Sequence, residues 1–452
     1  MKGNLFMSKL KNVGLSPAKI LLPKENFEKW AVVACDQYTS EPEYWERVKS
    51  FVGYSPSALN LILPEVYLEN ENLEDMQANT IEHMKRYLLN GVFQDEIGGM
   101  VYVERQVGNG YRKGLVTCVD LEEYDYKKGS ESLIRATEDT IEDRLPPRVA
   151  IRQKASLELP HVMLLIDDRE NTIFPYIKEN TTEEDTLYDF QLMEQGGHIK
   201  GYKVNEDIYD SLADKLEVLK QKNNGFLFAV GDGNHSLATA KKCWELIKEN
   251  LTDEEKEKHP ARYALVEIVN LHDDTLIFES IHRLLENVED DELNSIAQAI
   301  GLGDDLLPYY RNGSQGMFLI DCTGRLCVAA VQEGLNKYIN EHENVKIDYI
   351  HGDDTAQKLS LKENVITLIL PAFDKNALFP TVIADGALPR KSFSMGHAHE
   401  KRFYLEARQI TSDTLENLAE AGVEEIIGEI DDASADALAE MLSEDVIDGI
   451  IQ

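Results

Sequence analysis

The pattern of apolar and polar positions predicts alternating strands and helices along most of the 452-residue chain. Apolar residues recur at helical spacing in residues 41–52, 71–89 and 205–222, and each range is expected to form a helix. Short apolar runs predict strands at 31–35, 99–106 and 111–119, the last two joined by a Gly-Asn-Gly turn typical of a hairpin. This alternation favours an α+β (mixed α/β) fold.

A second group of strands and helices is expected to begin near residue 301, after Gly301-Leu302-Gly303. Its predicted strands are 316–321, 326–331 and 365–370. The pattern therefore divides the chain into a first domain at 1–300, a second, smaller α/β domain at 301–410 and an acidic tail at 411–452. Apolar residues at helical spacing in 412–422 and 434–450 predict two amphipathic helices in this tail, packed on the domain or on a second subunit.

The most informative stretch is an apolar strand that starts at Phe226, ends at Gly231-Asp232-Gly233 and passes directly into a helix. Two glycines let the backbone approach a ligand closely, and the first amides of the helix point at whatever the turn holds. This layout predicts a phosphate-binding turn whose candidate residues are Gly231, Asp232, Gly233, Asn234, His235 and Ser236. The alternative is an ordinary strand-to-helix turn in which Asp232 or Asn234 is the N-cap.

Five segments together resemble the family called domain of unknown function 1015. Residues 231–240 read GDGNHSLATA, similar to the family's usual ADGHHRYETA. The other four are residues 133–168, residues 263–285, IDYIHG at 347–352 and LPRKS at 388–392. The resemblance covers about residues 16–410. That family is related to the fold shared by ParB nucleotide-binding domains, sulfiredoxin and the archaeal free-serine kinase.

The resemblance implies a ParB/sulfiredoxin-like core with large insertions, which binds a nucleotide or phosphate. It also implies phosphoryl transfer to a small hydroxyl compound, with free L-serine as the specific expectation and O-phospho-L-serine as the product. In this interpretation Asp232 binds Mg2+ and His235 donates a hydrogen bond to the transferred group. A hydroxyl nucleophile benefits from a carboxylate that accepts its proton. The candidates for that base are Asp36, Glu41 and Glu43, and the sequence does not choose among them.

One departure from the family concerns positive charge, because Ser236 stands where the family usually has an arginine. Guanidinium groups clamp phosphate oxygens, so a cluster of arginines between residues 135 and 154 is a candidate replacement. The alternative is that these arginines pair with neighbouring carboxylates at the surface. The basic candidates for the binding site are Arg135, Arg144, Arg148, Arg152, His282, Arg283 and Lys391.

Composition narrows the class of partner. With 46 basic and 82 acidic residues the formal net charge is -36, which repels DNA and anionic membranes. No apolar run approaches the roughly 20 residues of a membrane helix. The five cysteines lack CxxC spacing, which favours a reducing cytoplasm. A small-molecule substrate is therefore expected, without nucleic acid or membrane, and a homodimer is a candidate assembly.

The phosphate donor is left open between ATP, ADP and pyrophosphate. The chain contains no GxxxxGK[ST] loop and no protein-kinase signature, which disfavours the common ATP-binding architectures. Two rival classes of function also stay open. One is a regulatory protein that binds a nucleotide without turnover, and the other is a small-molecule phosphohydrolase.

Overall fold

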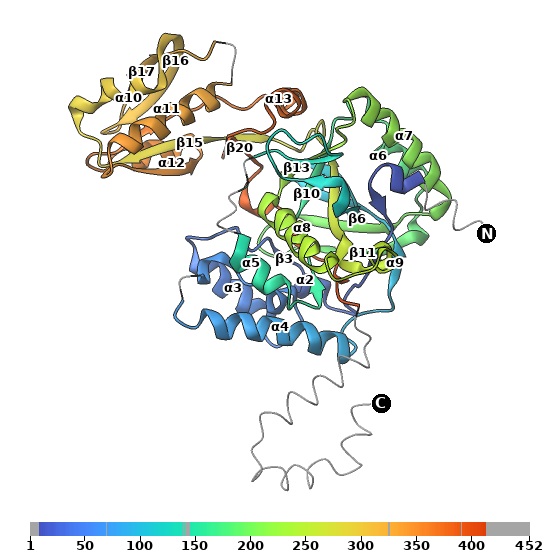
Figure 1. Ribbon diagram of the computed structural model, residues 1–452. Helices are drawn as coiled ribbons and strands as arrows, with labels where there is room; N and C mark the ends of the chain where they lie inside the picture. Colours follow the sequence, from blue (N-terminus) through green and yellow to red (C-terminus); the bar gives the residue numbers. More distant parts are fainter. Residues whose placement is uncertain are drawn as a thin grey trace, which may run out of the picture.

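The computed structural model describes residues 9–68, 70–138, 140, 145–323, 326–389 and 391–412. It has a large lobe and a small lobe (Figure 1). The large lobe is built on a ten-stranded mixed sheet, in which β1 pairs with β6 beside the path β11-β12-β5-β6-β14-β10-β13-β8-β7. Most neighbours are antiparallel, whereas β10–β14, β13–β8 and β7–β8 are parallel. The strands are β1 (Leu15–Ser16), β5 (Val101–Val107), β6 (Gly110–Asp120), β7 (Tyr124–Asp125), β8 (Ile134–Ala136), β10 (Met163–Ile166), β11 (Thr186–Gln191), β12 (His198–Lys203), β13 (Phe228–Asp232) and β14 (Tyr263–Asn270).

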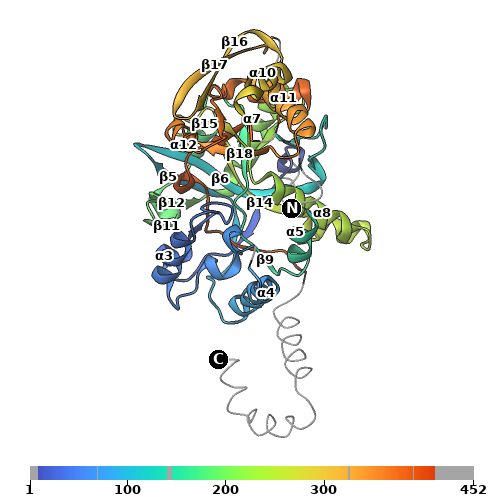
Figure 2. The ribbon, with the colours of Figure 1, turned by 90° about the vertical axis from the view of Figure 1, so that its left-hand side faces the viewer.

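Helices cover both faces of this sheet, because strand residues alternate between two cores. One core joins Tyr102 of β5 to α6 (Phe174–Glu179), α7 (Tyr209–Lys222) and α8 (Asn234–Lys248). The other joins Val101 and Val103 to α2 (Phe27–Trp30), α3 (Pro42–Val52) and α4 (Leu73–Leu89). Figure 2 shows α3 and α4 at the end of the large lobe that is remote from the small lobe.

The small lobe contains a six-stranded sheet in the order β17-β16-β19-β15-β18, with β20 also paired to β15. Helices α10 (Leu293–Ile300) and α11 (Cys327–Glu341) share a core with one face, and α12 (Asp353–Leu359) packs against part of the other. The strands are β15 (Phe278–Glu286), β16 (Leu302–Arg311), β17 (Ser314–Ile320), β18 (Lys346–His351), β19 (Ile366–Leu368) and β20 (Phe393–Met395).

The boundary expected at residue 301 falls inside this small lobe. Both β15 and α10 precede it, and Leu285 and Ile296 share a buried core with Phe318 of β17. Gly301, with φ 112°, is the C-cap of α10 and not part of a linker. The glycine pair therefore marks the end of a helix within one lobe, because a positive φ is what a glycine supplies there.

After the small lobe the chain returns to the large one. Helix α13 (Leu378–Asp385) and strand β20 are followed by a 3-10 turn at Ala398–Glu400. Strand β21 (Phe403–Tyr404) then pairs with β3 (Val32–Val33), and β22 (Arg408–Gln409) pairs with β9 (Leu157–Glu158). The part of the chain from α13 to β22, residues 378–409, is called the return segment. It passes the end of β13, where Met395 packs against Gly231.

Most local predictions are confirmed. Helices α3, α4 and α7 and the β5–β6 hairpin lie where the pattern placed them, and β17 and β19 overlap their predicted strands. The strand predicted at residues 326–331 is wrong, because this stretch begins α11. Its buried residues Val328, Val331, Leu335 and Tyr338 continue at helical spacing, and a six-residue window is too short to reveal that period. The two helices predicted in the tail lie outside the described residues, which end at Ser412.

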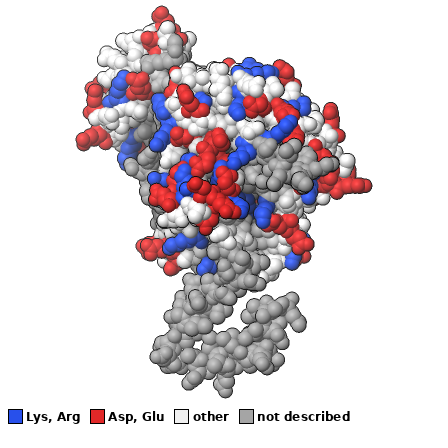
Figure 3. Space-filling model, turned by 45° about the vertical axis from the view of Figure 1, so that its right-hand side comes forward, with Lys and Arg blue, Asp and Glu red and all other residues white. Residues whose placement is uncertain are grey.

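Within the described residues, no helix is long and apolar enough to cross a membrane. On the face drawn in Figure 3, acidic side chains gather in the middle and basic ones lie around them. The strong negative charge is therefore visible at the surface, and an anionic ligand needs a local group of cations to bind.

Candidate active site

The turn between β13 and α8 has the geometry that its glycines permit. Gly233 is the N-cap of α8 with φ 80°, in the left-handed region. A Cβ at Gly231 would lie 2.8 Å from the Leu165 side chain, and one at Gly233 would lie 3.0 Å from Val162. Asp232 Oδ1 accepts a hydrogen bond of 2.9 Å from the Gly233 amide. The glycines are thus explained by packing and turn geometry, and the case for a ligand rests on the polar side chains.

The second oxygen of Asp232 faces a lysine from the return segment. Lys401 Nζ lies 3.2 Å from Asp232 Oδ2, and the two side chains are only 10% and 20% exposed. A nearly buried ammonium group therefore stands at the turn where Ser236 supplies no charge. The sequence patterns did not single out Lys401. One indication was present in the sequence. Lys401 follows LPRKS, in the part of the chain that departs from the family's usual aromatic-rich segment.

The backbone of Lys401 is held by the buried guanidinium of Arg105. Arg105 Nη1 donates to the Lys401 carbonyl at 2.5 Å, and Nη2 donates to the His399 carbonyl at 2.7 Å. The same side chain also binds the Gly196 carbonyl. Burial lowers the pKa of Arg105 well below its usual range, and the neighbouring Arg112 adds to this effect. Burying the Arg105 guanidinium costs solvation free energy, and its hydrogen bonds fix the segment that carries Lys401.

Asp36, directly after β3 and Cys35, is the predicted base that belongs to this site. Its Oδ1 accepts from Gln37 Nε2 at 3.0 Å, and its Oδ2 lies 3.9 Å from His161 Nε2. Burial raises the pKa of Asp36, but the charge of His161, the Gln37 hydrogen bond and the charges of Lys401 and Lys391 together lower it below its usual value. Asp36 therefore stays a carboxylate near neutral pH.

The other two candidate bases are placed differently. Glu41 and Glu43 are exposed at the start of α3, Glu41 as its N-cap. Of the three carboxylates, Asp36 is the one that lies near a histidine and whose pKa is lowered by the charges of Lys401 and Lys391. The structure thus separates candidates that the sequence left equal.

His161 is oriented by a hydrogen-bonded group behind it. His161 Nδ1 lies 2.8 Å from the Tyr404 hydroxyl, which donates to Cys35 Sγ at 3.1 Å. Burial raises the pKa of Cys35 to about 12, and the charge of Asp36 adds to this shift, so Cys35 stays a thiol. Tyr404 therefore keeps its proton directed at sulfur and presents an oxygen to His161, whose other nitrogen points at Asp36.

Arg283 and His282 have positioning roles in the small lobe. Arg283 is fully buried and its Nη2 donates to the Lys391 carbonyl at 2.9 Å, where Lys391 has a left-handed φ of 54°. His282 Nδ1 accepts from the Leu370 amide at 3.2 Å, so its Nε2 carries the proton directed at Asp353, 2.8 Å away. Arg283 thus holds the backbone of Lys391, whose side chain is exposed, while His282 bonds to residues within the small lobe.

His351, at the end of β18, joins the same electrostatic group. Its side chain is exposed, yet its pKa is lowered to about 4, first by desolvation and then by the charges of Lys391, Lys401, His282 and His397. The charges of Lys391 and Lys401 in the return segment therefore reach the end of β18 in the small lobe. The sequence patterns gave no signal for His351 beyond the IDYIHG element.

The arginine cluster does not converge on the turn. The Arg135 guanidinium lies 4.6 Å from the Phe226 ring centroid, and Arg148 Nη2 binds Glu65 at 2.8 Å. Arg152 pairs with the buried Glu158, and Arg144 lies outside the described residues. Arg148 and Arg152 thus each have a carboxylate partner, but Glu158 is buried, so the surface-pairing alternative fits Arg148 and not Arg152.

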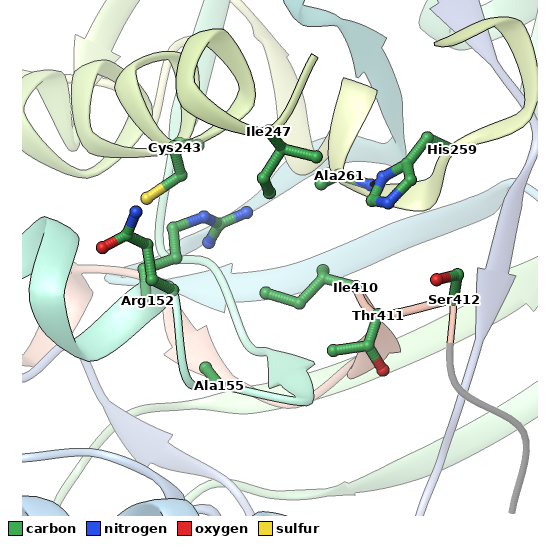
Figure 4. Close-up of a pocket in the computed structure, with 11 residues that line it drawn as sticks. Arg152, Ala155, Cys243, Ile247, His259, Ala261, Ile410, Thr411 and Ser412 are labelled. Carbon is green, nitrogen blue, oxygen red and sulfur yellow. Dashed lines mark hydrogen bonds between the residues drawn. The ribbon is translucent and has the colours of Figure 1, made fainter. Parts of the chain in front are cut away.

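Arg152 lines a cavity of about 200 Å³ together with Cys243, His259 and Ile410 (Figure 4). Cys243 lies nine residues after Asn234 on α8, or about 13 Å along the helix axis. This cavity is therefore separate from the Asp232 turn.

Three predicted residues, Asn234, His235 and Ser236, form the partly buried first turn of α8. Asn234 Oδ1 is buried and makes no hydrogen bond within the described part of the chain. A buried acceptor without a partner suits a ligand that donates a hydrogen bond. No group of three His, Cys, Asp or Glu side chains among the described residues forms a ready metal site. Mg2+ usually takes one or two carboxylates plus phosphate oxygens, a set that Asp232 and a bound phosphate would provide.

The chain is similar to a known protein family and to several solved structures. The family model described as "Protein of unknown function (DUF1015)" matches residues 15–362. The chain belongs to this family. No curated protein matches it. The match ends before Lys391 and Lys401, so the return segment of the site lies outside it.

Several solved structures are similar at low identity. A conserved hypothetical protein from Pyrococcus furiosus has a TM-score of 0.35 and 11% identity, over 67% of this chain and 97% of its own. A free serine kinase in complex with AMP has a TM-score of 0.37 and 12% identity, over 67% and 93% of the two chains. SbnI with a C-terminal truncation, from Staphylococcus aureus, has a TM-score of 0.36 and 9% identity, over 68% and 93%.

Proposed function

We propose that this protein is a phosphotransferase that acts on a small hydroxyl compound, with free L-serine as the first acceptor to test. The observation that carries the proposal is the arrangement around Lys401. Its ammonium group contacts the turn carboxylate of Asp232, and its charge lowers the pKa of Asp36. A phosphate-binding turn, a cation and an ionised carboxylate are the parts that phosphoryl transfer needs.

In this proposal the phosphate donor's terminal group lies at the N-terminus of α8. The amides of the first turn of a helix are not used by the helix itself, and its dipole favours an anion there. Lys401 would exchange the carboxylate of Asp232 for a phosphate oxygen. Asp232 would then be free to bind Mg2+, which neutralises charge on the phosphates when it is bound.

Asp36 would accept the proton of the acceptor hydroxyl. The hydroxyl oxygen forms a bond to phosphorus as the bond from phosphorus to the donor's bridging oxygen breaks. The bridging oxygen stays with the rest of the donor and keeps the electron pair of the broken bond. The proton passes to the Asp36 carboxylate and then to solvent. His161, held by Tyr404, orients Asp36 during this transfer. Most of the rate would come from positioning and charge stabilisation.

The resemblance described above supports this assignment, and it is also the reason for proposing a ParB/sulfiredoxin-like core within the ten-stranded sheet. ATP, ADP and pyrophosphate stay open as donors. The cysteine pattern supports a cytoplasmic location. Nucleic acid and membrane are not expected partners, given the charge of the chain.

Phosphorus NMR tests the proposal directly. Purified full-length protein is mixed with Mg2+, L-serine and, in parallel tubes, ATP, ADP or pyrophosphate. A phosphomonoester signal that requires serine supports a serine kinase and names its donor. Free phosphate released without an acceptor indicates a phosphohydrolase. Unchanged donors that nevertheless bind indicate a regulatory nucleotide-binding protein.

A matched pair of variants links the activity to the turn. Asp232→Asn should abolish transfer, and it should also lower stability, because it leaves the nearly buried Lys401 ammonium without its carboxylate partner. Asp214→Asn is the control, because Asp214 also pairs with a lysine, Lys9, but on the exposed surface. Full activity of Asp232→Asn would remove the turn from the mechanism.

A further inference from the structure

One edge of the small-lobe sheet lacks the usual protection against pairing with another strand. Strand β17 is at that edge, and among the described strands it pairs with β16 alone. Its sequence, SQGMFLI, contains no charged residue and no proline. The opposite edge strand, β18, carries Lys346 and Asp348. Because charged residues and prolines normally block edge-to-edge association, β17 is the open edge of this sheet.

The hairpin geometry tells which backbone groups of β17 face outward. Asn312 and Gly313 form a two-residue turn with φ 49° and 72°, closed by the pair Arg311 and Ser314. The pair that closes such a turn is hydrogen-bonded, and bonding then alternates along the strand. Gln315, Met317 and Leu319 therefore direct their N–H and C=O groups to the open edge.

The same residues belong to an uncovered apolar face. Leu306, Met317 and Leu319 are 64%, 46% and 52% exposed, and the register places Leu306 opposite Leu319. Helix α12 buries Leu284 and Ile350 on this side but leaves the hairpin uncovered. Four of the fourteen exposed large hydrophobic residues in the described chain lie here, the fourth being Leu361 beside Gly313 of the hairpin turn.

We propose that two copies of this chain associate through β17, antiparallel about a twofold axis at Met317. In this register Met317 pairs with Met317 of the second copy, and Gln315 pairs with Leu319 in both directions. Every outward N–H and C=O group of these three residues then has a partner. The apolar faces of the two hairpins become continuous, because strand neighbours share a face.

A second copy fits this edge because it presents the same uncharged strand with the same three outward-facing residues. A chain with net charge -36 repels itself over most of its surface, but this register brings no two charged residues of β17 together, since the strand has none. Figure 1 shows the β16–β17 hairpin at the outer side of the small lobe, remote from α8. The contact area of one strand and its face is below the roughly 800 Å² per partner of a standard interface. We therefore expect a concentration-dependent dimer.

Sedimentation velocity of the full-length protein, from roughly 1 to 100 µM, tests this proposal. The wild type should shift from monomer to dimer over that range. Met317→Pro removes an outward N–H and leaves the bonds to β16, which come from the neighbouring residues, so it should weaken the dimer at least tenfold with an unchanged circular dichroism spectrum. Met317→Lys should do the same by placing two like charges opposite each other.

Val218→Lys is the matched control, because Val218 on α7 is 51% exposed and also apolar. It should leave the dimer unchanged. A protein that is monomeric at every concentration overturns the proposal, and so does a dimer that both Met317 variants leave intact. Because β17 is remote from the proposed active site, phosphoryl transfer is expected to be the same in all three variants, and its absence in the wild type would not affect this test.

Discussion

Lys401 Nζ lies 3.2 Å from Asp232 Oδ2, although the two residues are 169 positions apart in the chain. The contact places one cation of the return segment at the turn that the sequence singled out. It supplies a positive charge at this turn, where Ser236 stands in place of the arginine of the family's usual motif.

Lys401→Gln should lower the rate of phosphoryl transfer about a hundredfold, which corresponds to about 2.7 kcal/mol of lost charge stabilisation. Lys401→Arg should retain part of the rate because it keeps the charge. Steady-state kinetics with the donor identified by NMR measure both. Lys337→Gln, which breaks the exposed pair with Glu333, is the control and should have no effect. An unimpaired Lys401→Gln enzyme would contradict the role given to this lysine.

Asp36→Asn should lower kcat by about a hundredfold or more and leave donor affinity unchanged, because the base acts only on the acceptor's proton. Glu43→Gln is the matched control, since Glu43 is exposed at α3. Because the pKa of Asp36 is lowered, this group keeps its charge as the pH falls from 7 to 5. An acid limb of the rate with a midpoint near 6 would identify a different base.

His351 should report the arrival of phosphate. Its pKa of about 4 reflects desolvation and nearby cations, and a bound polyanion would offset those cations and raise it. Histidine proton NMR titrations with and without pyrophosphate measure the shift. Below pH 6.5 the unfolded chain takes up this proton before the folded chain does, so stability falls as the pH goes from about 6.5 to 4. His351→Gln should reduce that fall, and an unchanged His351 pKa with saturating ligand would place the phosphates elsewhere.

Arg105→Met should lower the free energy of unfolding by about 3 kcal/mol, because it leaves several buried carbonyls of residues 196 and 399–401 without a donor. Urea denaturation measures the loss. Arg47→Met is the control. Arg47 pairs with Glu194, but the Arg47 side chain is 56% exposed, so this pair should contribute less than about 1 kcal/mol to the free energy of unfolding. Equal stability of the two variants would show that Arg105 does not hold the segment.

The sequence predicted the parts of the fold that local signals define. Helix α3 begins at a proline after Glu41, and α7 ends at Asn223-Asn224-Gly225, so both were found with nearly correct bounds. The start of α11 resembles a strand because residues 326–331 are apolar without a clear period. The boundary expected at residue 301 falls inside the small lobe, because the glycine that caps α10 resembles a linker glycine in the sequence.

The candidate site was predicted only in part, because only some of its residues are marked by local signals in the sequence. Asp36 lies just after β3 and Asp232 ends β13, and such positions are recognisable from the sequence alone. Lys401 and His161 are not, because Lys401 reaches the site through the pairing of β21 with β3 and His161 contacts Tyr404, and both contacts join distant parts of the chain. Arginines clustered in sequence were favoured over a single lysine, whereas the fold turns two of them toward Glu65 and Glu158.

The late return of the chain has a consequence for synthesis on the ribosome. Strands β3 and β9, from the first half of the chain, obtain their partners from Phe403–Tyr404 and Arg408–Gln409. A nascent chain that has emerged only to the end of the small lobe therefore has the Asp232 turn without its lysine. If the proposed function is right, transfer then requires the chain as far as Lys401, and a fragment cut short before residue 400 lacks this cation at the turn.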